Sequence, residues 1–128
     1  MAIIGLGTEI VECARLRAMI EEHGERFLMR VYVPEEIRHC QSHKNATEQF
    51  AAYWAAKEAV LRAVRITGRG AGIWAQVEIC RDGPHFIAKV HGAVRERLNA
   101  AGPASILVTA ACSRHYATAT AIVVGEAA

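Results

Sequence analysis

This chain lacks the patterns that define several common classes of protein. Its four cysteines (Cys13, Cys40, Cys80 and Cys112) form no Cys-x-x-Cys or Cys-x-x-His pair, and its six histidines form no His-Glu-x-x-His motif, so a zinc site has little support. No apolar run approaches the roughly 20 residues that a membrane-spanning helix needs, so we expect no membrane partner. The net charge of +2 is too small to indicate nucleic acid binding.

The N-terminal segment lacks the features of a signal peptide. Residues 2–12 are AIIGLGTEIVE, in which no basic region precedes the short apolar run and Glu9 interrupts it. We therefore expect a cytoplasmic protein whose cysteines are free thiols, most of them buried. The Gly5-Leu6-Gly7 fragment also lacks the third glycine and the following helix of a dinucleotide-binding fingerprint, which excludes a Rossmann-type interpretation.

The sequence does contain enough apolar material for one packed domain. Hydrophobic residues make up 52% of the 128 residues, and no linker, repeat or low-complexity segment divides them, so we predict a single domain over residues 1–128. Arginine supplies twelve of the 15 cations and glutamate twelve of the 13 acids. Arginine favours bidentate contacts with phosphate and carboxylate groups.

The hydrophobic periodicity predicts an α+β fold, with strands at both ends of the chain and helices between them. We expect a small antiparallel sheet that packs against one long central helix. The predicted strands cover residues 2–12, 75–81, 85–91, 105–112 and 116–124, and the predicted helices cover residues 13–23, 25–32, 34–42, 50–64 and 92–101.

The predicted helix over residues 50–64, FAAYWAAKEAVLRAV, organises the rest of the chain. Phe50, Trp54 and Leu61 repeat near the helical period and predict a buried stripe. The alanines between them favour a helix and add little bulk, so another element can pack close. Asn45 stands just before this helix and is a candidate for its N-terminal cap.

Three charged residues, Lys57, Glu58 and Arg62, stand beside this stripe. Because Glu58 and Arg62 are four residues apart, they share a helix face and can form a surface ion pair, which contributes about 0.2–0.5 kcal/mol. The alternative is that the carboxylate holds a metal ion while the two cations hold phosphates. Glu9, an acid in an apolar strand, has two similar interpretations: it faces solvent, or it is a metal ligand at the rim of the sheet.

The segment after the central helix, residues 65–74, is RITGRGAGIW. Its three glycines and two arginines offer backbone N–H groups and cations to an anion. The segment is equally compatible with an ordinary connection from a helix to a strand.

Three segments, in this order, resemble the holo-[acyl-carrier-protein] synthase family, the small trimeric 4′-phosphopantetheinyl transferases. IIGLGTEIVECARLR is similar to that family's Gly-x-Gly-x-Asp pattern with a following Arg. FAAYWAAKEAVLRA is similar to its FAxRxxxKEA signature, and SILVTAACSRHYATATAIV resembles its closing pair of strands. The resemblance covers essentially the whole chain.

The resemblance implies transfer of 4′-phosphopantetheine from coenzyme A to a serine of acyl carrier protein, with release of adenosine 3′,5′-bisphosphate. It implies Mg²⁺ held by Glu9 and Glu58, catalytic roles for Glu58 and Lys57, and a homotrimer with the site at the subunit boundary. Arg15 and Arg17 would contact the carrier protein. Glu58 and a metal-bound water are both candidates for the base that activates the serine. The residues implied to bind coenzyme A are Tyr53, Lys57, Arg62, Arg65, Gly68, Arg69, Gly70, Thr109 and Cys112.

The chain departs from the family's pattern and is therefore identified as a diverged member. Glu9 replaces the family's Asp, which extends the carboxylate by about 1.5 Å. Tyr53 and Cys112 replace an Arg and a His that help to hold coenzyme A near its 3′-phosphate. We therefore expect poor discrimination against dephospho-coenzyme A unless Arg65 or Arg69 reaches that phosphate. The alternative function is a non-catalytic relative that still binds a carrier protein.

Overall fold

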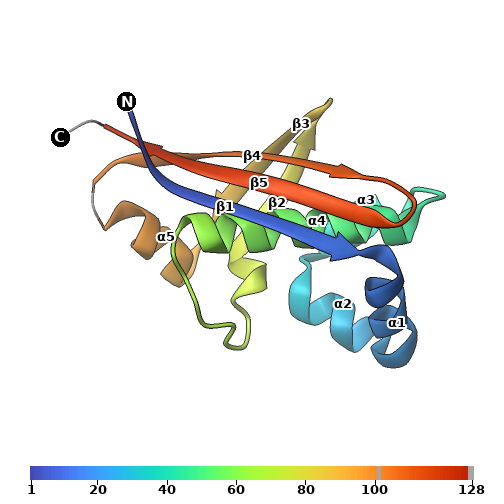
Figure 1. Ribbon diagram of the computed structural model, residues 1–128. Coiled ribbons are helices and arrows are strands. Elements are labelled where there is room, and N and C mark those ends of the chain that lie inside the picture. The colour runs from blue at the N-terminus through green and yellow to red at the C-terminus, as the bar shows by residue number, and fades with distance from the viewer. Residues whose placement is uncertain (101, 127–128) are drawn as a thin grey trace.

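The sheet of this protein is built from both ends of the chain, and the helices gather on one side of it (Figure 1). The computed structural model describes residues 1–100 and 102–126. Five antiparallel strands lie in the order β1-β5-β4-β3-β2, which confirms the predicted α+β class. In chain order the elements are β1 (Ala2–Glu12), α1 (Cys13–His23), α2 (Glu25–Val31), α3 (Pro34–Gln41), α4 (Ala46–Ala63), the 3₁₀ turn η1 (Trp74–Gln76), β2 (Val77–Asp82), β3 (His85–Val90), α5 (Gly92–Asn99), β4 (Ala104–Cys112) and β5 (Tyr116–Gly125).

The predicted element boundaries agree closely with these, apart from the start of α4. This helix begins at Ala46, earlier than predicted, and Asn45 occupies its N-cap position. The Asn45 side chain does not cap the backbone, because its amide donates instead to a Glu48 carboxylate oxygen at 2.9 Å. The predicted end of the last helix at Ala101 lies outside the described residues.

Two glycines of β1 allow the strand to lie directly on the backbone of α4. A Cβ atom at Gly5 would stand 2.0 Å from the carbonyl oxygen of Ala63, and one at Gly7 would stand 2.0 Å from that of Ala59. Neither position tolerates a side chain at this distance, because the obstacle is backbone and cannot rotate away. The Gly-Leu-Gly fragment therefore serves helix–strand packing.

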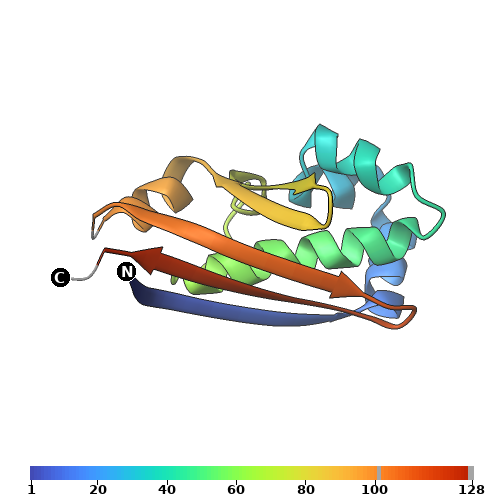
Figure 2. The same cartoon turned by 90° about the horizontal axis from the view of Figure 1, so that it is seen from above.

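The central helix α4 is buried almost all round. Figure 2 shows the elements that surround it. β1, β5 and β4 run side by side along it, and α1 and α3 pack on it from other directions. Phe50 and Leu61 are buried as the periodicity predicts, whereas Trp54 is half-buried. Lys57 is also fully buried in this helix, which the sequence pattern did not indicate.

The outer face of the sheet carries no helix within residues 1–100 and 102–126. Ile3, Leu6, Ile10 and Leu107 are exposed there, each by about 60% or more of its surface. The strand register places Leu6 beside Ile122 and Ile122 beside Leu107, so these apolar side chains form a continuous row across three strands. No helix of the described chain combines the length and the apolar character that crossing a bilayer requires.

Candidate active site

A pocket of about 620 Å³ opens where β1 meets α1 and α4. The two predicted metal ligands, Glu9 from β1 and Glu58 from α4, both line it, although they are far apart in the sequence. Arg62 and Arg15 line it as well, so acids and cations from three elements converge there. The remaining lining residues are Ile10, Val11, Glu12, Leu16, Met19, Trp54, Trp74 and Tyr116.

Glu58 accepts hydrogen bonds from two residues of the segment that follows α4. Arg69 donates through Nε to Oε1 at 3.0 Å and through Nη2 to Oε2 at 3.1 Å, and the indole Nε1 of Trp74 donates to Oε1 at 2.7 Å. Burial raises the pKa of this carboxyl group. The hydrogen bonds and the charges of Arg69 and Arg62 outweigh that effect and hold the pKa below its usual value. Glu58 is therefore a carboxylate at neutral pH.

Arg62 does not pair with Glu58, although the two share a helix face. Its Nη2 donates to Oε2 of Glu9 at 3.1 Å, and its Nη1 donates to the Thr8 carbonyl at 3.0 Å. The surface ion pair that helical spacing allows is therefore not formed. Glu9 and Glu58 instead each pair with an arginine from a different element.

A second, smaller pocket of about 430 Å³ is lined mainly by arginines. Arg62, Arg65 and Arg69 surround it together with Ile66 and Thr67, and Arg62 lines both pockets. Three guanidinium groups around one small space favour an anion with several oxygen atoms, such as a phosphate. We call this space the arginine pocket.

The backbone at Arg65 supports a role for its side chain. This residue follows the C-cap of α4 with φ of 68°, and the N–H of Ile66 donates to the Leu61 carbonyl at 2.9 Å, as in a Schellman motif. Glycine is the usual residue here, because any L side chain in this region costs about 1–2 kcal/mol. The chain instead places an arginine there, beside the arginine pocket.

The predicted residues Gly68 and Gly70 flank Arg69 in this loop. The space beside each is open, because a Cβ atom on either glycine would meet no heavy atom within 4 Å. The loop between α4 and η1 thus leaves its backbone accessible next to the arginine pocket.

Lys57 does not lie at either pocket, although it precedes Glu58 in the chain. Its ammonium group donates to Glu36 Oε1 at 2.8 Å, to the Trp74 carbonyl at 3.1 Å and to the Val77 carbonyl at 2.6 Å. Burial lowers the pKa of Lys57, and the Glu36 carboxylate offsets part of that effect. Because these three acceptors match the three protons of the ammonium group, this placement does not offer Lys57 to a phosphate.

Three residues expected to bind coenzyme A lie away from the arginine pocket. Tyr53 is fully buried in α4 and stacks on the ring of His39, with centroids 5.6 Å apart. Thr109 is exposed on the outer face of β4, and Cys112 is half-buried at the end of the same strand. The predicted coenzyme A residues thus do not all lie together within one copy of the chain.

The two arginines predicted to contact the carrier protein differ in their relation to the carboxylate pocket. Both are exposed on α1, but Arg15 lines the pocket and Arg17 is not among its lining residues. They are two residues apart on the helix and therefore point in different directions.

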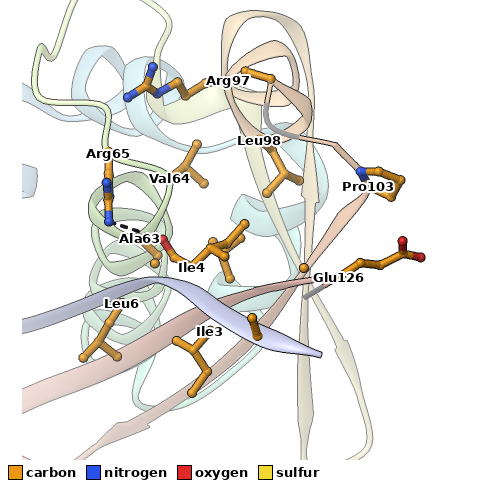
Figure 3. A pocket seen from close by; sticks show the side chains of 15 residues that line it. Ile3, Ile4, Leu6, Ala63, Val64, Arg65, Arg97, Leu98, Pro103 and Glu126 are labelled. Carbon is orange, nitrogen blue, oxygen red and sulfur yellow. Dashed lines mark hydrogen bonds between the residues drawn. The ribbon is translucent and has the colours of Figure 1, made fainter. Parts of the chain in front are cut away.

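The structure has a larger pocket, of about 950 Å³, at the opposite end of β1 (Figure 3). Its lining is mostly apolar and includes Ile4, Val64 and Leu98, and Arg65 and Arg97 stand at one side. Arg65 Nη2 donates to the Ile4 carbonyl at 3.4 Å. Glu126 is the one acid in the described lining, so this pocket lacks the paired carboxylates of the first.

Comparisons with known proteins show the family of this chain. The model of the 4′-phosphopantetheinyl transferase superfamily matches residues 5–120. This chain belongs to that superfamily. The chain is 46% identical to the holo-[acyl-carrier-protein] synthase of Rhodopirellula baltica over 95 residues, which cover 72% of this chain and 74% of that relative. It is 38% identical to the synthase of Koribacter versatilis over 121 residues, which cover 94% and 97%.

A solved structure of a family member has the same fold. The complex of the Chronobacterium ammoniagenes enzyme with coenzyme A superposes with a TM-score of 0.82 at 25% identity, covering 99% of this chain and all of that one. The predicted family, the phosphopantetheinyl transferase enzyme class and the fold are therefore confirmed.

The acids of this phosphopantetheinyl transferase suit Mg²⁺ better than a metal that needs a complete protein cage. Within the described residues, no three His, Cys, Asp or Glu side chains cluster as metal ligands. Mg²⁺ usually takes one or two carboxylates and fills its other positions with water and substrate phosphates. Glu9 and Glu58, beside the open arginine pocket, fit that preference.

Sequence reasoning missed two residues that hold this site together, Glu36 and Trp74. The available signal was Lys57 itself, because a lysine inside a helix that buries nearly every side chain requires a buried acceptor. That signal would not have identified Glu36 as the partner. For Trp74, no pattern in the sequence indicates that its indole reaches Glu58.

Proposed function

We propose that this chain transfers the 4′-phosphopantetheine group of coenzyme A to a serine of acyl carrier protein, in a Mg²⁺-dependent reaction. The supporting observation is that Glu9, Glu58 and Arg62 line one pocket, while Arg62 also lines the arginine pocket with Arg65 and Arg69. Paired carboxylates beside clustered guanidinium groups suit a metal–diphosphate ligand. The names of the relatives support the choice of acyl carrier protein and coenzyme A.

In this proposal Glu9 and Glu58 would hold Mg²⁺, which would stabilise negative charge on the phosphoryl group under transfer and on the leaving group. Arg62 turns from Glu9 to the diphosphate, and Arg69 and Arg65 hold the adenosine phosphates, including the 3′-phosphate. Gly68 and Gly70 let the loop backbone approach them.

The reaction forms one P–O bond and breaks another. The serine oxygen attacks the phosphorus that carries the pantetheine arm, and the bond from this phosphorus to the bridging oxygen breaks. The bridging oxygen leaves with adenosine 3′,5′-bisphosphate, and the serine hydroxyl loses its proton. Glu58 and a metal-bound water are the two candidates for accepting that proton, and the lowered pKa of Glu58 makes its carboxylate the weaker base.

The carrier protein would approach over α1. Arg15 is exposed and borders the carboxylate pocket, so a carrier serine that enters there passes this residue. We expect charge reversal at Arg15 to slow association with an acidic carrier more than reversal at Arg17 does. Added salt should reduce the wild-type rate and narrow this difference.

We also propose that the chain assembles as a homotrimer in the cytoplasm. Support comes from the apolar row Leu6–Ile122–Leu107, which leaves an uncovered apolar surface in a single copy. Thr109 lies on the same outer face, so a neighbouring copy would bring it to a site at the subunit boundary. Four free thiols suit a reducing compartment.

Sedimentation tests the proposed homotrimer. Leu6→Asp should shift the trimer to a monomer, and a monomeric wild-type protein would contradict the proposed assembly.

The direct test is mass spectrometry of an apo carrier protein after incubation with the chain, coenzyme A and Mg²⁺. We expect the phosphopantetheine adduct with wild type, none after chelation of the metal, and none with Glu58→Gln. Glu35→Gln, at an exposed position of α3, is the matched control and should modify the carrier normally. Absence of the adduct, with a carrier that another transferase modifies, would contradict the proposal.

A further inference from the structure

Glu58 accepts hydrogen bonds from two residues, Arg69 and Trp74, that differ in side-chain length and in surroundings. Arg69 has a long side chain that is 24% exposed and also borders the arginine pocket. Its guanidinium group spans both carboxylate oxygens, so a metal ion at Glu58 would have to displace at least one of these bonds. Trp74 contacts Oε1 alone, at 2.7 Å, and leaves Oε2 available once Arg69 moves.

Trp74 is anchored at both its backbone and its ring. Its carbonyl accepts a hydrogen bond from the ammonium group of Lys57 at 3.1 Å. Its ring stands edge-on to Trp54, with centroids 6.2 Å apart, and Trp54 in turn contacts Phe27 at 5.1 Å. The indole N–H therefore has little freedom to leave Glu58. The guanidinium group of Arg69 is held as well, because its Nη1 donates to the Ile66 carbonyl at 2.8 Å and to the Gly68 carbonyl at 3.2 Å, but it stands at the end of a longer and more exposed side chain.

The ion pair behind Trp74 is itself fixed by three elements. Lys57 of α4 and Glu36 of α3 are fully buried and 2.8 Å apart. Glu36 Oε1 also accepts from the Val33 N–H at 2.8 Å, and its Oε2 accepts from the Ile79 N–H of β2 at 2.7 Å. A buried pair with every polar atom satisfied has no competing arrangement at low free energy, so it serves as a rigid support.

We propose that Trp74 is a positioning residue for the carboxylate of Glu58, and that the buried Lys57–Glu36 pair fixes Trp74 in turn; the inference rests on the proposed role of Glu58 as a metal ligand. Two consecutive residues of α4 hold the same tryptophan, Lys57 at the carbonyl and Glu58 at the indole. Because both residues bond to Trp74, the direction of Glu58 Oε2 is set before a metal ion binds. Lys57 thus supports the reaction without contacting phosphate.

The test measures metal affinity directly, with Mn²⁺ as the probe and adenosine 3′,5′-bisphosphate present, by electron paramagnetic resonance. Trp74→Phe keeps an aromatic ring and removes only the N–H donor. We expect it to weaken Mn²⁺ binding about ten- to a hundredfold, the usual effect of losing a hydrogen bond to a metal ligand. Arg38→Ala, at an exposed ion pair of α3 that does not line the pocket, is the control and should bind Mn²⁺ with little change.

Enzyme kinetics separate positioning from a general structural defect. For Trp74→Phe we expect a higher Mg²⁺ concentration at half-maximal rate, with kcat largely restored at saturating Mg²⁺ and the Michaelis constant for the carrier protein unchanged. A fall in kcat that Mg²⁺ does not restore would overturn the positioning role. Circular dichroism checks that the variant is folded.

A double-mutant cycle tests the link from Lys57 to Trp74. In a Lys57→Met/Glu36→Gln background, which removes both buried charges together, the additional effect of Trp74→Phe on Mn²⁺ affinity should be much smaller than in wild type. If Trp74→Phe lowers the Mn²⁺ affinity by the same factor in both backgrounds, the link between Lys57 and Trp74 is overturned. If this background does not fold, Lys57→Met with Glu36→Leu provides a second version of the same cycle.

The outcomes distinguish this inference from the proposed function. If Glu58→Gln abolishes Mn²⁺ binding and Trp74→Phe binds like wild type, the positioning role is overturned and the metal role of Glu58 stands. If Glu58→Gln binds Mn²⁺ like wild type, both are overturned, because there is then no metal ligand to position.

Discussion

Lys57 and Glu58 are neighbours on α4, yet their ion pairs lie in opposite environments. Lys57 and Glu36 are fully buried, whereas the side chains of Glu58 and Arg69 are 10% and 24% exposed. The Glu9–Arg62 pair is more exposed still. All three pairs join an acid to a cation at about 3 Å, so distance alone does not separate a structural pair from a functional one.

The difference lies in what can replace each partner. A buried charge that loses its partner is not solvated by water, so separation of the Lys57–Glu36 pair costs a large amount of free energy. The two pocket pairs adjoin solvent, and a metal ion or a phosphate can take the place of either partner. The interior of α4 therefore provides rigidity, and its pocket side provides exchangeable charges.

The largest loss of stability should follow when one partner of the buried Lys57–Glu36 pair is removed. Lys57→Met leaves the Glu36 carboxylate buried without its cation, so the free energy of unfolding should fall by about 3–5 kcal/mol. Urea denaturation measures it. Lys57→Met/Glu36→Gln should recover part of the loss, and a loss below about 1 kcal/mol in the single variant would show that the pair contributes little.

Substitution of the adjacent residue, Glu58, should change stability little and activity strongly. Glu58→Gln keeps an oxygen for the Trp74 indole, so we expect the free energy of unfolding to change by no more than about 1 kcal/mol. The rate of transfer should fall at least about a hundredfold, because a metal ion contributes several kcal/mol to such a transition state. Denaturation and turnover are measured on the same preparation. A variant that is strongly destabilised would mean that Glu58 belongs with the structural pair.

The most exposed pair should matter least for stability. Arg62→Ala removes a pair whose arginine is half exposed, so we expect a change in unfolding free energy of about 0–1 kcal/mol. The Michaelis constant for coenzyme A should rise, since Arg62 borders both pockets. Arg38→Ala, at another exposed ion pair, is the control and should leave that constant unchanged. Equal constants in the two variants would contradict the proposed phosphate role.

The smallest expected effect is a difference in thiol reactivity between cysteines in the buried interior and those that are half-buried. Burial and the Glu36 charge raise the pKa of the Cys40 thiol to about 12, whereas Cys80 and Cys112 are only half-buried. A thiol reagent should therefore label Cys80 and Cys112 in the folded protein and reach Cys40 only on unfolding. Mass spectrometry of the labelled peptides measures the order. Early labelling at Cys40 would show that the interior beside Lys57 opens readily.

Much of the fold could be predicted because its determinants are local. The apolar period along 50–64 predicted α4, and the turn residues near 82–84 and 113–115 predicted the two hairpins that the structure contains. The pairing of Glu9 with Glu58 at one pocket came from the family resemblance, since residues so far apart share no local pattern. The burial of Lys57 could not be predicted for the same reason, because its partner Glu36 lies on another helix.

By itself the sequence determined the elements, their order and the family, because periodicity, turn chemistry and motif spacing are properties of short segments. Only the tertiary structure decided which partner each charged side chain takes. It buried Lys57 against Glu36, turned Arg62 from Glu58 to Glu9, and brought Trp74 to Glu58. The physical reason is that an ion pair or hydrogen bond between distant segments depends on burial and orientation, which exist only after α3, α4 and the sheet have packed together.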